Sequence, residues 1–254
     1  MSHDQHVTQQ FDSTAERYRV STVHAQGPDL AFLHAVAERL APTRALDVGC
    51  GPGHASFAMA PFCKKVHAVD ASSAMLKIVV EDARKRHFGH IEVHEAPATH
   101  LPFPDASMDL VSCRYSAHHW RDVREGIAEI ARVLKPGGVF VLTDSIGHDA
   151  PLLDTHLQAI ELLRDTSHVR NYRVQDWMAI LGQQGLALEH CDVFRVRLAF
   201  REWVERSQTS PERIAVISQL LTDAPSEVRQ ALAVEEDGSF WLDVLTCQTR
   251  KAMP

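Results

Sequence analysis

The spacing of hydrophobic residues changes repeatedly between two periods in the N-terminal half of the chain. Hydrophobic positions recur at steps of three and four after Pro28, after Ser72 and within 123–134, which predicts a helix at each place. The short runs between such helices are rich in hydrophobic and β-branched residues and predict strands at 44–48, 66–69, 91–93, 109–113 and 139–143. Because strands alternate with helices, the pattern predicts a parallel sheet with helices on both faces.

The C-terminal part of the chain departs from this alternation. Residues 186–194 and 240–247 have the character of strands, but no short helical crossover joins them, so we expect an antiparallel pair at one edge of the sheet. Residues 147–177 and 195–237 are rich in His, Arg and Trp and predict mostly helical insertions. Open α/β sheets bind ligands at the carboxyl ends of their strands. We therefore expect one α/β domain over 1–254, with a doubly wound, mostly parallel seven-stranded sheet whose carboxyl edge the insertions cover.

Composition and charge narrow the classes of protein. The formal net charge is −7 at pH 7 and the isoelectric point is near 6.1, which argues against nucleic acid as a partner, because phosphate neutralisation needs a concentrated basic surface. No signal-peptide pattern and no apolar run of membrane-spanning length occur, so we expect a cytoplasmic protein without membrane insertion. The five cysteines are scattered without a C-x-x-C pair, and the HExxH spacing is absent, which predicts no structural metal.

A glycine-rich turn joins the first predicted strand to a helix. Gly49, Gly51 and Gly53 alternate with other residues, and glycines there let the backbone turn sharply and approach a ligand. A dinucleotide fingerprint would need Gly or Ala at the place of His54, and a Walker loop would need a lysine. Asp70 ends the next strand, where such folds hold a ribose diol, so the ligand is expected to be a nucleoside. A plain tight turn followed by a helix cap is the alternative.

Four ordered motifs resemble one known family. LDVGCGPG at 46–53, VDAS at 69–72, LPFPDASMDLV at 101–111 and ARVLKPGG at 131–138 are similar to class I S-adenosylmethionine-dependent methyltransferases. The ubiquinone/menaquinone C-methyltransferase-like group, also called methyltransferase type 11, resembles them best, and the similarity covers 11–144. The resemblance implies a Rossmann-like fold. It also implies that S-adenosylmethionine gives its methyl group to a small-molecule acceptor by in-line displacement and leaves S-adenosylhomocysteine.

The resemblance assigns roles in cofactor binding. It implies that Gly49 and Gly51 approach the methionine and ribose portions and that Asp70 binds the ribose hydroxyls. Met75 would pack on the adenine, and Ala98 would meet the adenine edge through its backbone. The full set of implied cofactor-binding residues is Tyr18, Asp47, Gly49, Cys50, Gly51, Asp70, Ala71, Met75, Pro97, Ala98 and Arg114.

Three residues of this set, Pro97, Arg114 and Tyr18, need separate comment on the part of the cofactor that they would contact. Pro97 stands where many relatives carry an Asp that accepts from the adenine amine, so adenine recognition is expected to use backbone groups or water. Arg114 could bind the cofactor carboxylate in a bidentate manner through two N–H groups of its guanidinium. A salt bridge within the protein, at the surface or at the edge of the sheet, is its alternative role. A pattern that ends in Tyr18 is similar to the family's N-terminal lid, which we expect over 1–28, and implies that Tyr18 lies near the methionine end.

Residues after the fourth predicted strand bear on the methyl acceptor. Residues 113–116 read CRYS instead of the Asp/Asn-Pro-Pro-Tyr of nucleic-acid amino methyltransferases, and no Pro-Cys nucleophile occurs, so we expect a small-molecule acceptor. Tyr115 is predicted to bind it. His168 and Arg170 are predicted to do so from an insertion, and a plain turn in which Asp165 caps the next segment is an equal alternative.

Two adjacent histidines are the predicted catalytic residues. His118 or His119 would act as a general base on the acceptor. We favour His119, because relatives often keep a histidine just before the aromatic residue, here Trp120. If the chain is extended here, neighbouring side chains point to opposite sides, so one histidine faces the cleft and the other is buried with a hydrogen bond to the backbone.

Two other functions remain open from the residues alone. A nucleotide-dependent oxidoreductase can use the same sheet and the same glycine turn. A non-catalytic protein that binds S-adenosylmethionine would also keep these motifs. The sequence allows a homodimer and does not name the acceptor.

Overall fold

The structure is a computed structural model that describes residues 1–21 and 25–253. The strands form one mixed sheet in the order β3-β2-β1-β4-β5-β7-β6. They are β1 (Arg44–Val48), β2 (Lys65–Asp70), β3 (Ile91–Glu95), β4 (Met108–Arg114), β5 (Leu134–Ser145), β6 (Leu186–Leu198) and β7 (Phe240–Lys251). The first five strands pair in parallel, and β7 is antiparallel to both β5 and β6. The predicted sheet and its antiparallel C-terminal edge pair are confirmed.

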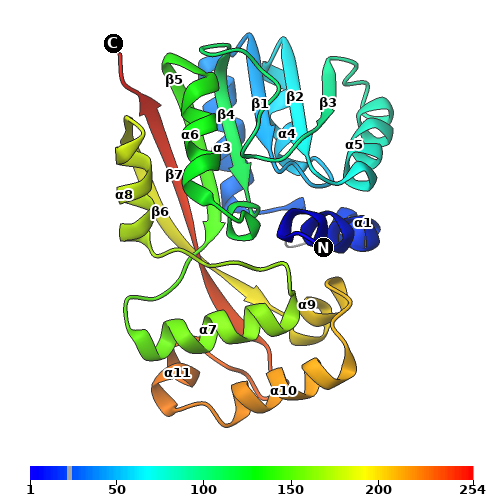
Figure 1. Ribbon diagram of the computed structural model, residues 1–254, viewed down its shortest axis with the longest axis vertical. Helices are drawn as coiled ribbons and strands as arrows, with labels where there is room; N and C mark the ends of the chain where they lie inside the picture. The colour runs from blue at the N-terminus through cyan, green and yellow to red at the C-terminus, as the bar shows by residue number, and fades with distance from the viewer. Residues whose placement is uncertain (22–24, 254) are drawn as a thin grey trace.

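Different helices cover the two faces of the sheet (Figure 1). The covering helices are α3 (Pro28–Leu40), α4 (His54–Met59) with the short 3-10 helix η1 (Ala60–Phe62), α5 (Ser73–Lys85), α6 (Val123–Val133) and α8 (Val174–Gln183). Neighbouring residues of a strand point to opposite faces, and in β1 Leu46 belongs to the hydrophobic core beneath α6 and α8. Ala45 belongs to the core beneath α3 and α4, and α5 packs on that same side. This doubly wound arrangement leaves the carboxyl ends of the parallel strands uncovered by these helices.

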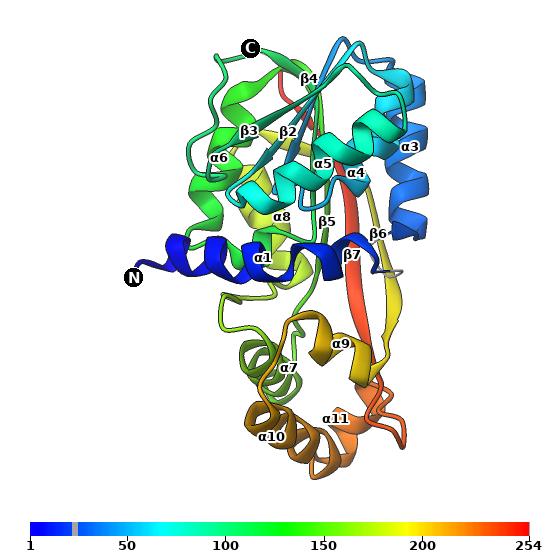
Figure 2. The same ribbon diagram turned by 90° about the vertical axis from the view of Figure 1, so that its right-hand side faces the viewer.

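A separate layer of helices lies beyond the carboxyl ends of the parallel strands. Figures 1 and 2 show α7 (Pro151–Arg164), α9 (Phe200–Arg206), α10 (Pro211–Thr222) and α11 (Ser226–Ala231) around the far ends of the long strands β6 and β7. These helices share a hydrophobic core that is distinct from the cores of the sheet. The predicted helical insertions supply them, and their role as a cap over the acceptor stays a prediction.

The boundaries of the two predicted insertions are wrong at one end each. The stretch 195–198 was expected to be helical but continues β6, because each of these residues pairs with β7, from Arg195 opposite Asp243 to Leu198 opposite Phe240. Helix α8 begins inside the stretch 147–177 but packs against β6 and α6, so it belongs to the cover of the sheet.

The N-terminal helix α1 (His3–Arg19) crosses the carboxyl edge between the sheet and the helical layer (Figure 1). A capping box between Ser2 and Gln5 begins it. Its apolar residues, with Tyr18 buried among them, pack on α5, and Arg19 pairs with Asp82. The predicted lid over 1–28 contains this helix, although residues 22–24 lie outside the described residues. Closure of this segment over a ligand stays a prediction.

Candidate active site

The three glycines after β1 are required for different reasons. At Gly49, with φ +67°, a Cβ atom would lie 1.9 Å from the hydroxyl oxygen of Ser116. At Gly53, with φ +91°, a Cβ atom would press on Phe57 at 3.1 Å. At Gly51, with φ +50°, a Cβ atom would meet nothing within 4 Å, because this residue faces an open pocket. The first two glycines allow the turn to pack, whereas Gly51 leaves space for a ligand.

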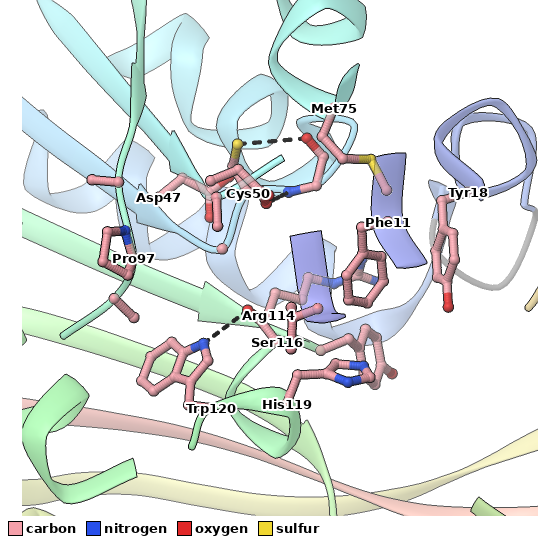
Figure 3. A pocket seen from close by; sticks show the side chains of 18 of the residues that line it. Phe11, Tyr18, Asp47, Cys50, Met75, Pro97, Arg114, Ser116, His119 and Trp120 are labelled. Carbon is pink, nitrogen blue, oxygen red and sulfur yellow. Dashed lines mark hydrogen bonds between the residues drawn. The ribbon is translucent and has the colours of Figure 1, made fainter. Parts of the chain in front are cut away.

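The pocket beside Gly51 brings together residues from distant parts of the sequence. We call it the first pocket, and it encloses about 1070 Å³ of space, part of it open to solvent. Its walls are the loops at the carboxyl ends of the parallel strands and helix α1, and Figure 3 shows Phe11 and Tyr18 reaching into it from that helix. All eleven residues predicted to bind the cofactor line it: Tyr18, Asp47, Gly49, Cys50, Gly51, Asp70, Ala71, Met75, Pro97, Ala98 and Arg114.

Asp70 places a carboxylate in this pocket at the end of β2. Its two oxygens accept hydrogen bonds from the backbone N–H of Gly51 at 2.8 Å and of Ser72 at 2.9 Å. These bonds fix the carboxylate relative to the glycine turn. Burial raises the pKa of Asp70 to about 6, so the group is ionised at neutral pH. Each oxygen keeps a lone pair for a hydroxyl of a ligand.

Asp47 and Arg114 are tied into the surrounding protein. Asp47 is fully buried and accepts hydrogen bonds from the hydroxyls of Ser56 at 2.7 Å and Ser112 at 3.0 Å. Arg114 forms an ion pair with Asp29 of α3. The salt-bridge alternative for Arg114 is therefore present in the structure, although the residue also lines the first pocket.

A second pocket adjoins the first on the side of the helical layer. It encloses about 560 Å³, and the two pockets share Phe11, Tyr18, Tyr115 and His119 as a common wall. The remaining lining residues come from β5 to β7, α7, α9 and the 3-10 helix η2 (Ala117–His119). They are His118, Ser145, Glu161, Arg164, Val196, Leu198, Trp203, Arg206, Leu242 and Val244.

The two adjacent histidines do not lie on an extended chain. They form the end of η2, and their ring centroids are 4.2 Å apart, so the extended chain that would have put them on opposite sides is not present. The cause is a tight turn in which the backbone N–H of His119 donates to Ser116. Consequently both rings belong to one cluster, in which His119 lines both pockets and His118 lines the second.

His118 is paired with a buried carboxylate. Its Nδ1 lies 2.5 Å from Asp144 Oδ1, and its backbone N–H donates to the other oxygen of Asp144 at 3.1 Å. Burial alone would lower the pKa of His118, but the charge of Asp144 and this hydrogen bond outweigh burial and raise the pKa. Because Asp144 holds Nδ1–H, the neutral ring carries its lone pair on Nε2.

His119 has a different environment. Its Nδ1 lies 3.1 Å from the hydroxyl oxygen of Ser167, and the edge of Phe11 packs on its ring at a centroid distance of 4.9 Å. Burial and the neighbouring charge of His118 hold the pKa of His119 well below its usual value. His119 is therefore a neutral, tightly packed ring that lines both pockets, and Figure 3 shows it near Phe11 in the lining of the first.

The residues predicted to bind the acceptor separate into two groups. Tyr115 lines both pockets. His168 and Arg170 are not among the described lining residues of either one. His168 is buried behind the histidine pair, 5.7 Å from the His118 ring and bonded to Gln158, while Arg170 pairs with Asp154 at 2.8 Å. The packing of α7 against this segment occupies both side chains.

Four ionisable residues near the second pocket were not found from the sequence. Asp144 is the penultimate residue of β5, at the carboxyl edge of the sheet, which is the one signal that could have indicated it. Glu161, Arg164 and Arg206 lie on short amphipathic helices whose charged residues would ordinarily face solvent. Their burial arises only when α7 and α9 pack against β6, β7 and α1.

A further cluster of potential metal ligands lies away from both pockets. His67, Glu92 and His94 on β2 and β3 bring one ligand atom each to within 4.8 Å of one another. Lys65 donates to Glu92 at 2.7 Å, and Arg44 lies 3.2 Å from His67. Two cations beside the cluster oppose the binding of a third. The expectation of no metal stays a prediction.

Comparisons with known proteins show the family. A protein-family model described as a methyltransferase domain matches residues 46–142. An uncharacterised methyltransferase of Bacillus subtilis, YcgJ, is 34% identical over 224 residues, which are 88% of each chain. The uncharacterised protein YafE of Escherichia coli is 36% identical over 80% of this chain and 99% of its own. The crystal structure of YcgJ has a TM-score of 0.84 at 32% identity and covers 89% of this chain and 99% of that one.

The chain belongs to the class I S-adenosylmethionine-dependent methyltransferases. It is an enzyme that uses S-adenosylmethionine as its methyl donor. Similarity to a demethylmenaquinone methyltransferase of Clavibacter sepedonicus, at 33% identity over 61% of this chain and 65% of that protein, agrees with the resemblance found from the sequence. The comparisons give no support to an oxidoreductase or to a non-catalytic binding protein.

The next features concern the binding partners of the protein and its location in the cell. Among the described residues, no helix combines the length and the apolar character needed to cross a membrane. The absence of a nucleic-acid partner, the homodimer and the cytoplasmic location stay predictions.

Proposed function

We propose that the first pocket holds S-adenosylmethionine, that the second pocket holds the methyl acceptor, and that His118 is the general base of the reaction. The observation that carries this proposal is that the two pockets adjoin each other and share four lining residues. Methyl transfer requires the donor and the acceptor to come within van der Waals distance, and adjoining pockets allow this. The shared residues Tyr115 and His119 mark the place where they meet.

The first pocket fits the cofactor in shape and in chemistry. Gly51 leaves open space for the close approach of a ligand, and Asp70 offers two oxygens to a ribose diol. The buried thioether of Met75 supplies an apolar surface for a flat base, and the backbone around Ala98 forms the opposite wall. When bound, S-adenosylmethionine supplies a methyl group that its sulfonium centre has already activated for displacement. The role of the protein is to bind, to orient and to exclude water.

His118 is better suited than His119 to remove a proton from the acceptor. Asp144 fixes the orientation of the His118 ring and stabilises the imidazolium that forms when Nε2 takes a proton. His119 lacks such a carboxylate on its ring, and its lowered pKa makes protonation costly. We therefore transfer the role of base from His119 to His118 and give His119 the role of a wall that positions the two reactants. An acceptor with a phenolic, amino or acidic carbon nucleophile would use this base.

The test combines binding with transfer. The enzyme is incubated with S-adenosylmethionine that carries an isotopically labelled methyl group and with a small-molecule extract, and labelled products are identified by mass spectrometry. The expected result is label in a small molecule, with transfer lost in His118→Ala and retained in His119→Ala at a lower rate. Calorimetry with S-adenosylhomocysteine should show the same affinity in His118→Ala as in the unmodified enzyme. Full transfer by His118→Ala would contradict the assignment of the base.

A further inference from the structure

We propose that the second pocket selects an acceptor that carries an anionic group on an apolar body, and that Arg206 binds the anion. This inference rests on the proposed function of that pocket as the acceptor site. The pairing of the buried charges and the apolar residues that line the same pocket support it.

Arg206 is a buried cation whose described hydrogen-bond and ring partners, Ser21 and Tyr18, are neutral. Its side chain lines the second pocket, and the residue is only 9% exposed. One guanidinium nitrogen donates to the hydroxyl of Ser21 at 3.2 Å, and the group lies 5.8 Å from the centre of the Tyr18 ring. Its buried Nε–H has no hydrogen-bond acceptor among the described residues. A buried guanidinium in this state lacks the compensation that burial of a charge normally requires.

The second arginine of the pocket is already paired. Arg164 donates from Nε to the carbonyl of Trp203 at 3.1 Å and lies 3.6 Å from Glu161. The nearby carboxylate of Asp165 accepts from the N–H and the hydroxyl of Ser167 and does not line the pocket. Glu161 therefore lies within ion-pair distance of Arg164, whereas Arg206, on which the charge of Glu161 also acts, forms no ion pair with a carboxylate among the described residues.

The pKa of Arg206 agrees with the absence of an ion-pair partner for its guanidinium in the described part of the chain. Burial and the repulsion of Arg164 lower the pKa of Arg206 to about 10, so the group stays charged at neutral pH but at a cost. A carboxylate or phosphate beside it would reduce that cost and would satisfy the unpartnered Nε–H.

The rest of the pocket is suited to an apolar body. Val196 and Leu198 of β6, Leu242 and Val244 of β7, and the indole of Trp203 line it. His118 and the four residues shared with the first pocket complete the lining. An acceptor that contacts both Arg206 and His118 would place its anionic group beside the guanidinium and its nucleophile beside the imidazole.

Direct binding tests this inference without turnover. The dissociation constants of benzoate, phenyl phosphate and the neutral analogue benzamide are measured by calorimetry in the presence of saturating S-adenosylhomocysteine. We expect at least one of the two anions to bind about 10- to 100-fold more tightly than benzamide, the range for hydrogen bonds to charged groups. The tighter of the two anions identifies whether the pocket prefers a carboxylate or a phosphate.

Variants of Arg206 then locate the anion. Arg206→Met should abolish the advantage of the anion over benzamide, and Arg206→Lys, which keeps the charge but lacks the Nε–H, should reduce anion affinity by about 2- to 10-fold. Arg201→Met is the matched control, because Arg201 lies on the same helix with an 88% exposed side chain and should behave as the unmodified enzyme. Arg206→Lys provides the comparison if Arg206→Met does not fold.

The outcomes separate this inference from the proposed function. Equal binding of the anions and benzamide by the unmodified enzyme, or no binding of either anion up to about 10 mM, would overturn the inference. Unchanged anion affinity in a folded Arg206 variant would also overturn it. In each of these cases unchanged binding of S-adenosylhomocysteine and loss of label transfer in His118→Ala would leave the proposed function standing.

Discussion

The two pockets differ in how the chain builds them. The first is formed largely by turns that directly follow parallel strands, and the carboxylate of Asp70 in its lining is fixed by backbone N–H groups of those turns. The second is formed mainly by side chains from α7, α9, β6 and β7, and its lining includes the ionisable side chains of His118, His119, Glu161, Arg164 and Arg206. Under the proposed function, cofactor recognition is therefore built largely from turns next to the strands, whereas acceptor recognition depends on how distant segments pack.

This difference predicts that substitutions in the two pockets have separable effects. The largest effect is expected from replacement of the proposed general base, His118. His118→Ala should lower kcat by about 100-fold or more, because no other group would take the proton of the acceptor, while the affinity for S-adenosylhomocysteine stays the same. Steady-state kinetics with the identified acceptor measure kcat, and calorimetry measures the affinity for S-adenosylhomocysteine. His87→Asn is the control, because His87 is an exposed histidine that is not among the lining residues of either pocket and its replacement should leave kcat unchanged.

The ribose carboxylate should show the opposite separation. Asp70→Ala removes an ionised acceptor of hydrogen bonds and should weaken S-adenosylhomocysteine binding by about 1.5 to 3 kcal/mol. In the unmodified enzyme the same affinity should fall as the pH decreases through about 6, because protonation of Asp70 removes one acceptor oxygen. Calorimetry across pH measures both effects. A folded Asp70→Ala enzyme with unchanged affinity at every pH would exclude Asp70 from cofactor binding.

The open space at Gly51 gives a sharper test of the first pocket. Gly51→Val places a branched side chain where the cofactor is proposed to approach and should weaken S-adenosylhomocysteine binding by about 1 to 3 kcal/mol. Gly185→Val is a matched control, because Gly185 has φ +68° and its Cβ would also meet nothing within 4 Å, but it lies after α8, away from the pocket. Thermal unfolding should show a similar loss of stability in both variants. Similar cofactor affinity in both would mean that the loop is not where the cofactor binds.

The smallest effect on the reaction is expected from replacement of Asp144, which pairs with His118. Asp144→Asn removes the charge that raises the pKa of His118, so the pKa should fall. Because the base must be neutral to act, the rise of kcat with pH should begin at a lower pH in the variant. By the same linkage, the stability that the ion pair contributes is present at low pH and is lost as the pH rises through the raised pKa of His118. A pH profile of kcat that does not move would show that another group is titrating.

The sequence alone determined the fold and the first pocket. Alternation of strands and helices fixed the parallel sheet, and the carboxyl ends of adjacent strands meet at one edge whatever the helices do. The glycines around Gly51 and the carboxylate of Asp70 could therefore be placed together from short motifs, and all eleven expected residues line one pocket.

Only the tertiary structure decided the second pocket. The tight turn of η2 put His118 against Asp144 and reversed the preference for His119, since a difference of a few backbone angles decides which ring meets a carboxylate. Arg206 lies on a seven-residue helix whose sequence would suit solvent as well as the interior. Its burial depends on the packing of α9 against α1, a contact between residues almost two hundred positions apart, and no local pattern encodes such a contact.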